Sequence, residues 1–317
     1  MKGCAWKRAG RVGEICEPDQ NESDRERGKE MDNNRMLLKN CPISCFADEI
    51  DPKIDKQLAL LEELGISWIE MRSGDGKGVA EYTQQDAEAL KKRLEERKIR
   101  VSAVGSPIGK IDITEAFEPH FETFCNIVRL AQIWETPYIR CFSFFIPEGA
   151  DPAIFRDEVL RRIERMVELA SKEKLTLLHE NEKGIYGDNA ARCLDLMQNF
   201  YGDAYKATFD FANYIQCGQD TMEAYEMLKD YIEYIHIKDA LALSGQVVPA
   251  GEGDGHVRDI LTLLDERGFK GFLSLEPHLA DFAGLSQLEK EAAVRGRSDT
   301  EAAFVTAYQA LCGILAQ

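Results

Sequence analysis

The sequence lacks the features that would suit it to nucleic acids or membranes. Its 39 Lys and Arg residues are outnumbered by 56 Asp and Glu residues, which gives a formal charge of −17. Such a charge repels phosphate backbones and anionic membranes. No apolar run approaches the ~18 residues that a transmembrane helix needs, and the acidic N-terminus lacks the apolar segment of a signal peptide. We therefore predict a cytoplasmic protein with no nucleic-acid or membrane partner.

A paired cysteine motif is also missing. The nine cysteines are scattered, and none forms a C-x-x-C pair. An odd number of widely spaced cysteines in a chain of this length indicates reduced thiols rather than a disulfide framework. Cys41 and Cys45 have a loosely metal-like spacing. Because no second Cys/His pair lies nearby, a structural zinc site there is the weaker interpretation.

Residues 1–38 lack a sustained apolar period and are dominated by charged residues, Gly, Asn and Gln. Such a segment cannot bury enough surface to offset the entropy of ordering it. We predict a disordered leader at 1–38 and a single domain at 39–317. Met31 and Met36 stand just before the organised region, so a misassigned start is one explanation for the leader. A regulatory or docking tail is the other.

From Pro42 onward, short apolar runs alternate with amphipathic stretches, which is typical of βα units and a parallel sheet. Eight strands and eight helices over this length predict a (β/α)₈ TIM barrel in the α/β class. A doubly wound sheet would need a phosphate-binding Gly motif after the first strand, and residues 47–51 are not one. The predicted strands are Ile43–Phe46, Trp68–Met71, Val101–Val104, Tyr138–Phe142, Leu175–His179, Ala207–Asp210, Tyr234–Ile237 and Phe272–Leu275. The predicted helices are Lys53–Leu64, Thr83–Lys98, Glu115–Trp134, Pro152–Lys172, Ala190–Asn199, Thr221–Leu228, Val257–Gly268 and Thr300–Leu315.

The last four predicted strands each end in a residue that can bind a divalent metal, namely Glu180, Asp210, His236 and Glu276. The carboxyl ends of barrel strands converge at one face, where the active sites of TIM barrels lie. Three carboxylates and one imidazole suit Mn²⁺, Mg²⁺ or Co²⁺, and Zn²⁺ also accepts such donors. One such residue alone is more often a helix cap or a surface charge. Four on successive strands predict a metal site.

Further polar residues cluster near the same strand ends. Lys238 and His278 each lie two residues beyond a predicted ligand and share its face. Glu70 and Arg72 likewise share a face, which predicts an ion pair at the barrel mouth. His179 would point away from Glu180 and is expected to pack. The candidate substrate-binding residues are Glu70, Arg72, Lys110, Asn213, Lys238, Glu252 and His278.

Two of these candidates lie in Gly-rich loops. Lys110 follows the third strand and could reach a phosphate, a carboxylate or an enolate oxygen, while a solvated lysine is the alternative. Glu252 lies with Asp254 in the loop 249–255, which we expect to be flexible and able to close over a substrate. A loop that only caps the next helix is the other interpretation.

These motifs resemble the xylose isomerase-like barrels, in particular the sugar phosphate isomerase/epimerase family, which shares a superfamily with apurinic endonuclease family 2. The resemblance covers about Ile43 to Leu315 and implies a small carbohydrate substrate. It also implies a divalent metal, Mn²⁺ first, held by Glu180, Asp210, His236 and Glu276. A homo-oligomer or a small partner subunit is compatible with it. The motifs are Ile69-Glu70-Met71-Arg72, Gly105-Ser106-Pro107-Ile108-Gly109-Lys110, His179-Glu180-Asn181-Glu182, Phe209-Asp210-Phe211-Ala212-Asn213, His236-Ile237-Lys238-Asp239, Gly251-Glu252-Gly253-Asp254 and Leu275-Glu276-Pro277-His278.

The resemblance implies a sugar isomerase or epimerase in which Glu180 and Glu276 move a proton next to a carbonyl through a metal-stabilised enediolate. The chain departs from the tagatose-type epimerases, which have a sugar-contacting His where this chain has Asn213 and an Arg where it has Ala242. A lyase or C-deglycosidase acting on 3-keto sugars or glycosides is therefore the alternative. A non-catalytic sugar-binding barrel is more remote. The five histidines are too few for the multi-zinc cluster of the endonucleases.

Overall fold

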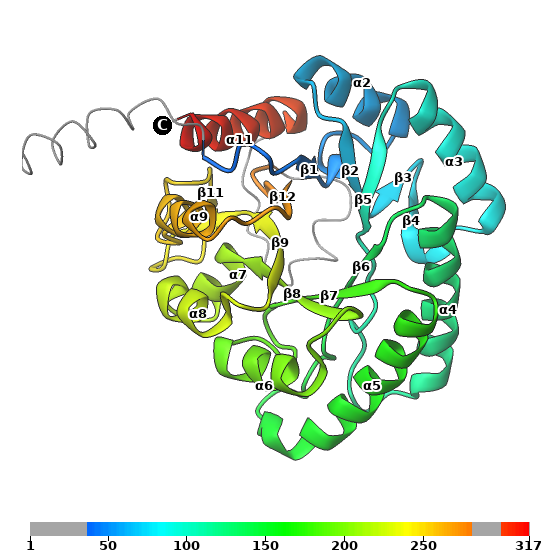
Figure 1. Cartoon of the computed structure of the whole chain (residues 1–317), viewed down its shortest axis with the longest axis vertical. Helices are drawn as coiled ribbons and strands as arrows, with labels where there is room; N and C mark the ends of the chain where they lie inside the picture. The colour runs from blue at the N-terminus through cyan, green and yellow to red at the C-terminus, as the bar shows by residue number, and fades with distance from the viewer. Residues whose placement is uncertain (1–36, 281–298, 317) are drawn as a thin grey trace, which may run out of the picture.

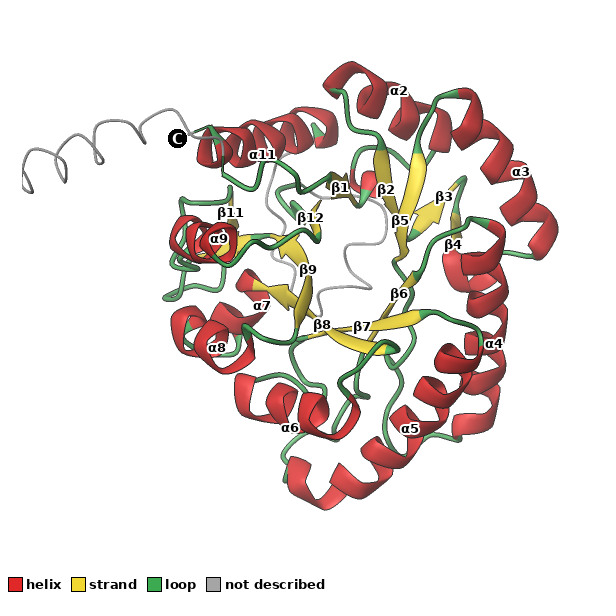
Figure 2. Ribbon diagram, viewed as in Figure 1, coloured by secondary structure: helices red, strands yellow, loops and turns green. Residues whose placement is uncertain are grey.

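The computed structural model describes residues 37–280 and 299–316, so most of the predicted leader lies outside the described residues. The predicted (β/α)₈ barrel is confirmed: eight parallel strands form a ring, and helices surround it (Figures 1 and 2). Leu38 is buried, and the Leu37 amide donates to the Leu315 carbonyl. The order round the ring is β1 (Ile43–Cys45), β12 (Phe272–Leu275), β9 (Ile232–Ile237), β8 (Tyr205–Asp210), β7 (Thr176–Glu180), β6 (Tyr138–Cys141), β5 (Arg100–Val104) and β2 (Trp68–Met71).

All eight predicted helices are present, with ends set by local chemistry. Thr83 and Asp86 form a reciprocal capping box at the start of α3, and Gly65, at φ 72°, ends α2 in the left-handed conformation. The predicted helix Pro152–Lys172 is divided, since its first turn is the 3₁₀ helix η3 (Pro152–Phe155). The helices are α2 (Ile54–Leu64), α3 (Gln84–Glu96), α4 (Phe117–Ile133), α5 (Arg156–Lys172), α6 (Ala190–Phe200), α8 (Thr221–Leu228), α9 (Val257–Glu266) and α11 (Thr300–Leu315).

Several short elements at the carboxyl ends of the strands were not predicted, because each is too short to show a period. They are η1 (Ala47–Glu49), the hairpin of β3 (Ser73–Gly74) and β4 (Lys77–Gly78), η2 (Val79–Glu81), α7 (Phe211–Gln216), and the hairpin of β10 (Asp239–Ala240) and β11 (Val247–Val248). The strand predicted as Leu175–His179 also lies one residue later, so that Glu180 belongs to β7.

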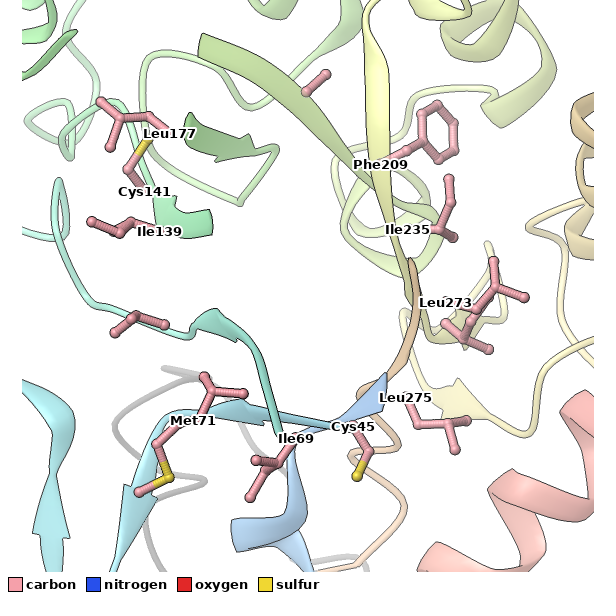
Figure 3. Packing of buried hydrophobic residues seen from close by; sticks show 14 of the residues in the cluster. Cys45, Ile69, Met71, Ile139, Cys141, Leu177, Phe209, Ile235, Leu273 and Leu275 are labelled. Atoms are coloured by element: carbon pink, nitrogen blue, oxygen red, sulfur yellow. The ribbon is translucent and has the colours of Figure 1, made fainter. Parts of the chain in front are cut away.

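Alternation along the strands separates two environments. The outward residues pack against the helices, as Figure 3 shows for Ile69, Ile139, Leu177, Ile235 and others. The inward residues form a smaller cluster of Ala103, Leu178 and Tyr234, with Tyr138 and Phe272 against it. Beyond this inner cluster, toward the carboxyl ends of the strands, the inward positions become polar. The inward buried polar residues include Ser44, Glu70, Arg140, Glu180, Asp210, His236 and Ser274.

β1 and β2 stand at the two ends of the hydrogen-bonded order, and a side-chain ion pair links them. Arg72, just after β2, donates to both oxygens of Asp48 at 2.8 and 3.0 Å. Its guanidinium also lies 4.4 Å from the centroid of the Phe46 ring, directly after β1. Both Arg72 and Asp48 are buried. This bidentate pair therefore connects the two ends of the barrel sheet.

We expect Arg72→Met to destabilise the barrel by about 3–5 kcal/mol, because it leaves the Asp48 carboxylate buried without its cation. Urea unfolding followed by circular dichroism measures the change. The control is Arg93→Met, which removes a partly exposed arginine that pairs with Asp55 and Asp75 and should cost about 1 kcal/mol or less. Equal losses in the two variants would contradict the proposed role of Arg72 at this junction.

A partly buried histidine, His120, holds the loop that contains Lys110. The Gly109 amide donates to His120 Nε2 at 2.7 Å, so this nitrogen must be unprotonated. Burial and, to a smaller extent, the Arg162 guanidinium lower the pKa of His120 to about 4. Burial also lowers the pKa of His179 to about 4. Both histidines are therefore neutral in the folded protein over the range in which they titrate when unfolded.

The folded protein should lose stability as the pH falls from about 6.5 toward 4, because unfolding lets these two histidines take up protons. We expect His120→Gln, which keeps a hydrogen-bond acceptor, to reduce this loss by on the order of 1 kcal/mol between pH 7 and 5. Urea unfolding at each pH measures it. His256→Gln is the control, since this exposed histidine should leave the pH dependence unchanged. An unaltered slope in His120→Gln would refute the assignment.

Candidate metal centre

The four predicted ligands converge at the carboxyl ends of neighbouring strands. Glu180 and Asp210 end β7 and β8, His236 lies near the end of β9, and Glu276 follows β12. Each offers one donor atom, and these atoms lie within 4.8 Å of one another. His236 Nδ1 is 3.2 Å from Glu180 Oε1, 3.7 Å from Glu276 Oε2 and 4.0 Å from Asp210 Oδ2. All four residues are buried.

The donor atoms suit a divalent cation. His236 Nδ1 and Asp210 Oδ2 are buried and form no hydrogen bond of good geometry among the described residues, although Glu180 Oε1 and Lys238 Nζ each lie 3.2 Å away. A cation held by these atoms and by Glu180 and Glu276 would satisfy both of them. Carboxylates with one imidazole fit Mg²⁺, Mn²⁺ or Co²⁺ and also Zn²⁺. The cluster could therefore hold a divalent metal.

Glu70 lies behind His236. Its carboxylate is 3.1 Å from His236 Nε2 and accepts a 2.7 Å hydrogen bond from Ser274 Oγ. A proton on Nε2 directed at Glu70 leaves Nδ1 as the free donor for a metal. The predicted ion pair between Glu70 and Arg72 is wrong. Glu70 contacts His236, and Arg72 forms an ion pair with Asp48 instead. Glu70 is 1% exposed and lies where it can orient His236.

Burial and neighbouring charges set the protonation of the carboxylates before a metal binds. Burial raises the pKa of Asp210 to about 7, although the Lys238 ammonium opposes this. Burial would also raise the pKa of Glu180, but His236 and Arg140 outweigh it and lower this pKa to about 2. Glu180 is therefore ionised at neutral pH, whereas Asp210 carries a proton part of the time.

Three buried cations touch the ligand carboxylates. Lys238 Nζ lies 3.1 Å from Glu276 Oε2 and 3.2 Å from Asp210 Oδ2. Arg72 donates to Glu276 Oε1 at 3.0 Å. Arg140, on β6, donates to Glu180 Oε2 at 3.1 Å. Sequence reasoning missed Arg140, although a charged residue inside the apolar run Tyr138–Phe142 was a signal for it.

The sequence matches the xylose isomerase-like TIM barrel family over residues 58–296. The chain belongs to this family. The match covers most of the barrel, including all four ligand-bearing strands. The resemblance inferred from the motifs is thereby confirmed. No curated protein matches the sequence.

Solved structures of similar fold include sugar epimerases and a dehydratase. An L-ribulose 3-epimerase superposes with a TM-score of 0.68 at 18% identity, over 87% of this chain and 94% of that one. The probable 3-DHS dehydratase AsbF of Bacillus anthracis gives 0.63 at 18% identity, over 84% and 97%. A xylose isomerase-like TIM barrel protein of Mycobacterium smegmatis in complex with magnesium gives 0.65 at 14% identity, over 88% and 98%.

Asn213, which differs from the tagatose-type epimerases of this superfamily, contacts the metal ligands themselves. Its Nδ2 donates to Glu180 Oε1 at 3.2 Å and to the Asn181 carbonyl at 2.9 Å. Its backbone amide donates to Asp210 Oδ1, which caps α7. Ala242, the other departure, is exposed in the β10–β11 hairpin. Asn213 therefore orients two of the candidate ligands.

His278 joins a second acidic group beside the ligands. Its backbone amide donates to Glu49 Oε2 at 2.7 Å, and its Nε2 lies 3.5 Å from both Glu49 Oε1 and Glu276 Oε1. Burial lowers the pKa of His278, but the Glu49 and Glu276 carboxylates together outweigh this and the pKa rises to about 9. Burial raises the pKa of Glu49 to about 7. Sequence reasoning missed Glu49, although it follows the first strand as the ligands follow theirs.

The two loop candidates lie at the rim. Lys110 pairs with Glu182 at 2.7 Å and stacks over Phe142. Glu252 is exposed. The expected flexible loop 249–255 is anchored, because the Asp239 carboxylate accepts hydrogen bonds from the amides of three of its glycines. The expectation of a free lid is therefore corrected.

The structure gives no support to a zinc site at Cys41 and Cys45. The metal-like clusters found within residues 37–280 and 299–316 contain no cysteine. Cys41 Sγ instead donates to the Phe269 carbonyl, and Cys45 is buried in the core. No helix of the described part of the chain is long and apolar enough to cross a membrane.

We expect Glu70→Gln to weaken divalent-metal binding by about 10–100-fold, because the loss of charge behind His236 makes Nδ1 a poorer and less well oriented donor. Isothermal titration with Mn²⁺ and with Mg²⁺ measures this. The control is Glu233→Gln, which lies near the start of β9, the strand of His236, where the carboxylate binds Tyr138 and Lys206. An unchanged metal affinity in Glu70→Gln would remove its positioning role.

Proposed function

We propose that the protein is a divalent-metal-dependent isomerase or epimerase of a sugar or sugar derivative. The observation that carries the proposal is the pair Glu180 and Glu276, which come from β7 and β12 with β8 and β9 between them. Both carboxylates face the donor cluster of Asp210 and His236. A bound divalent ion, with Mn²⁺ as our first choice, would polarise a substrate carbonyl and make the neighbouring proton more acidic.

Glu180 and Glu276 would move the proton between the two faces of the substrate carbon. Both are ionised near neutral pH, since Lys238 and His278 outweigh the effect of burial and hold the pKa of Glu276 well below its usual range. Glu180 would remove the proton. Glu276 would pass a proton to the opposite face after accepting it from Lys238 or His278, which contact it. Glu180 would then release its proton to solvent, and the donor would be protonated again. The charge that develops on the substrate oxygens would lie beside Lys238 and Arg140.

A lyase is the second candidate, and two observations favour it. The tagatose-type sugar contacts are replaced by Asn213 and Ala242, and one structure of similar fold is described as a probable dehydratase. An elimination would begin with the same proton removal and would then need an acid for the leaving group. His278 and Lys238 could provide that proton. The candidate substrates are 3-keto sugars and glycosides, as for a C-deglycosidase.

The burial of the charged groups argues against the non-catalytic alternative. Six carboxylates lie inside the barrel mouth, and burying ionised groups is costly even when they are paired. A barrel that only bound neutral sugars would have no need of both acid/base glutamates in this setting. The six are Asp48, Glu49, Glu70, Glu180, Asp210 and Glu276.

We expect Glu180→Gln and Glu276→Gln each to reduce turnover by at least ~10²–10⁴-fold while the fold is kept, because a neutral amide cannot take up the proton. Exchange of solvent deuterium into a ketose such as D-fructose, followed by NMR in D₂O with Mn²⁺, measures proton removal. Parallel incubation with a 3-keto glycoside measures aglycone release.

Glu173→Gln is the control for these variants, because this partly exposed carboxylate directly after α5 lies away from the mouth and binds Gln132. Deuterium exchange without aglycone release supports the isomerase, and release supports the lyase. Full activity in both glutamine variants would rule out the acid/base assignment.

A further inference from the structure

Within the described residues, two of the buried cations in the metal centre pair with no acidic group other than the candidate metal ligands. The ion pairs of Lys238 are with Asp210 and Glu276. Those of Arg140 are with Glu180, at 3.1 Å, and Glu276, at 3.7 Å. Arg72 differs, because Asp48 and Glu49 also neutralise it. Lys238 and Arg140 must therefore share their carboxylates with any bound metal.

Arg140 is held rigidly and keeps hydrogen-bonding capacity. Its guanidinium lies 4.8 Å from the Phe46 ring centroid and 5.0 Å from that of Phe142. Its terminal nitrogens donate to Glu180 and to the Gly105 carbonyl, whereas Nε is buried without a hydrogen-bond partner among the described residues. A planar guanidinium fixed between aromatic rings is well suited to recognise a carboxylate.

A divalent ion changes the charge balance around these two cations. Lys238 Nζ contacts the Asp210 and Glu276 carboxylates, and Arg140 contacts that of Glu180. A divalent ion bound by the same carboxylates would draw their negative charge toward itself and weaken the pairing of both cations. An uncompensated charge in a buried site is unfavourable, and a negatively charged ligand would restore the balance.

The two cations also lie close to the reacting centre. Lys238 Nζ contacts Glu276 Oε2, and Arg140 approaches Oε1 of the same carboxylate. They therefore stand on either side of one metal ligand. We expect an anionic group that reaches both to be bonded directly to the carbonyl carbon at the metal. A phosphate at the far end of a sugar chain would not reach them.

We propose that Lys238 and Arg140 recognise a carboxylate next to the reacting carbonyl, so that the substrate is a keto acid or sugar acid rather than a neutral ketose. This inference rests on the proposed function, because it assumes that a metal-bound carbonyl is the reacting group. It names the substrate class, which the family match leaves open.

Three small carbonyl compounds test the inference by equilibrium binding rather than by turnover. Hydroxypyruvate carries the carboxylate, dihydroxyacetone replaces it with a neutral hydroxymethyl group, and dihydroxyacetone phosphate places the charge farther away. Isothermal titration with the full chain saturated in Mn²⁺ gives each affinity. We expect hydroxypyruvate to bind at least ~10-fold more tightly than either other compound.

Hydroxypyruvate can also chelate a metal without help from the protein, so the variants decide the cause of the preference. Lys238→Gln and Arg140→Gln should each reduce the preference by about 10-fold at saturating Mn²⁺, and Lys238→Arg should restore most of it. The matched control is Lys206→Gln, which removes a lysine that pairs with Glu233 at the opposite end of the barrel. It should leave the preference unchanged.

The outcomes separate this inference from the proposed function. Equal binding of hydroxypyruvate and dihydroxyacetone, or a preference retained in both glutamine variants, would overturn the carboxylate site and leave the metal-dependent function standing. Tighter binding of dihydroxyacetone phosphate would replace it with a phosphate site. Failure to bind Mn²⁺, or to bind any of the three compounds, would overturn both.

Discussion

The burial of a charged layer at the carboxyl ends of the strands is the constraint on which the rest of this barrel depends. Six carboxylates lie in that layer, and each would be unstable there without a cation or a hydrogen-bond donor. Arg72, Arg140 and Lys238 supply part of the compensation. His236 Nδ1 and Asp210 Oδ2 form no hydrogen bond of good geometry within the described residues, and a divalent cation would supply what is missing.

Residues of this charged layer both close the barrel and contact the candidate catalytic groups. Arg72 joins the ends of the sheet through Asp48 and also holds Glu276, a candidate acid/base group. Asp239, directly after Lys238, anchors the glycine loop 249–255 through backbone amides. Residues that hold the frame are thus in direct contact with, or adjacent in sequence to, residues that would do the chemistry. Such rigidity is what a preorganised site requires.

The family match accounts for the fold, whereas the reaction and the substrate are proposals that depend on the site. Structures of similar fold at 14–18% identity include a ribulose epimerase, a probable dehydratase and a magnesium complex, and proton removal next to a carbonyl can serve both of the named reactions. Substrate choice depends on the groups around the metal, where this chain has Asn213, Arg140 and Lys238. Those groups have the chemistry of an anion site, in contrast to the neutral contacts that a simple ketose would need.

The sequence by itself determined the strands, the helices and the four candidate ligands. Apolar runs alternate with amphipathic stretches, and Glu180, Asp210, His236 and Glu276 each lie at the end of such a run. A period of two also indicated that Glu70 and Arg72 share a face. It could not identify their partners, and the ion pair predicted between them was wrong.

Only the tertiary structure decided those partners. Glu70 meets His236 and Arg72 meets Asp48 because the strands that carry them are brought together round the ring. The same holds for the loop 249–255. Its glycine amides can donate to the Asp239 carboxylate only when the fold has brought the loop next to that residue. Sequence periodicity fixes the face on which a side chain lies, whereas its neighbour on that face depends on strand order and register, which are set by the packing of the whole barrel.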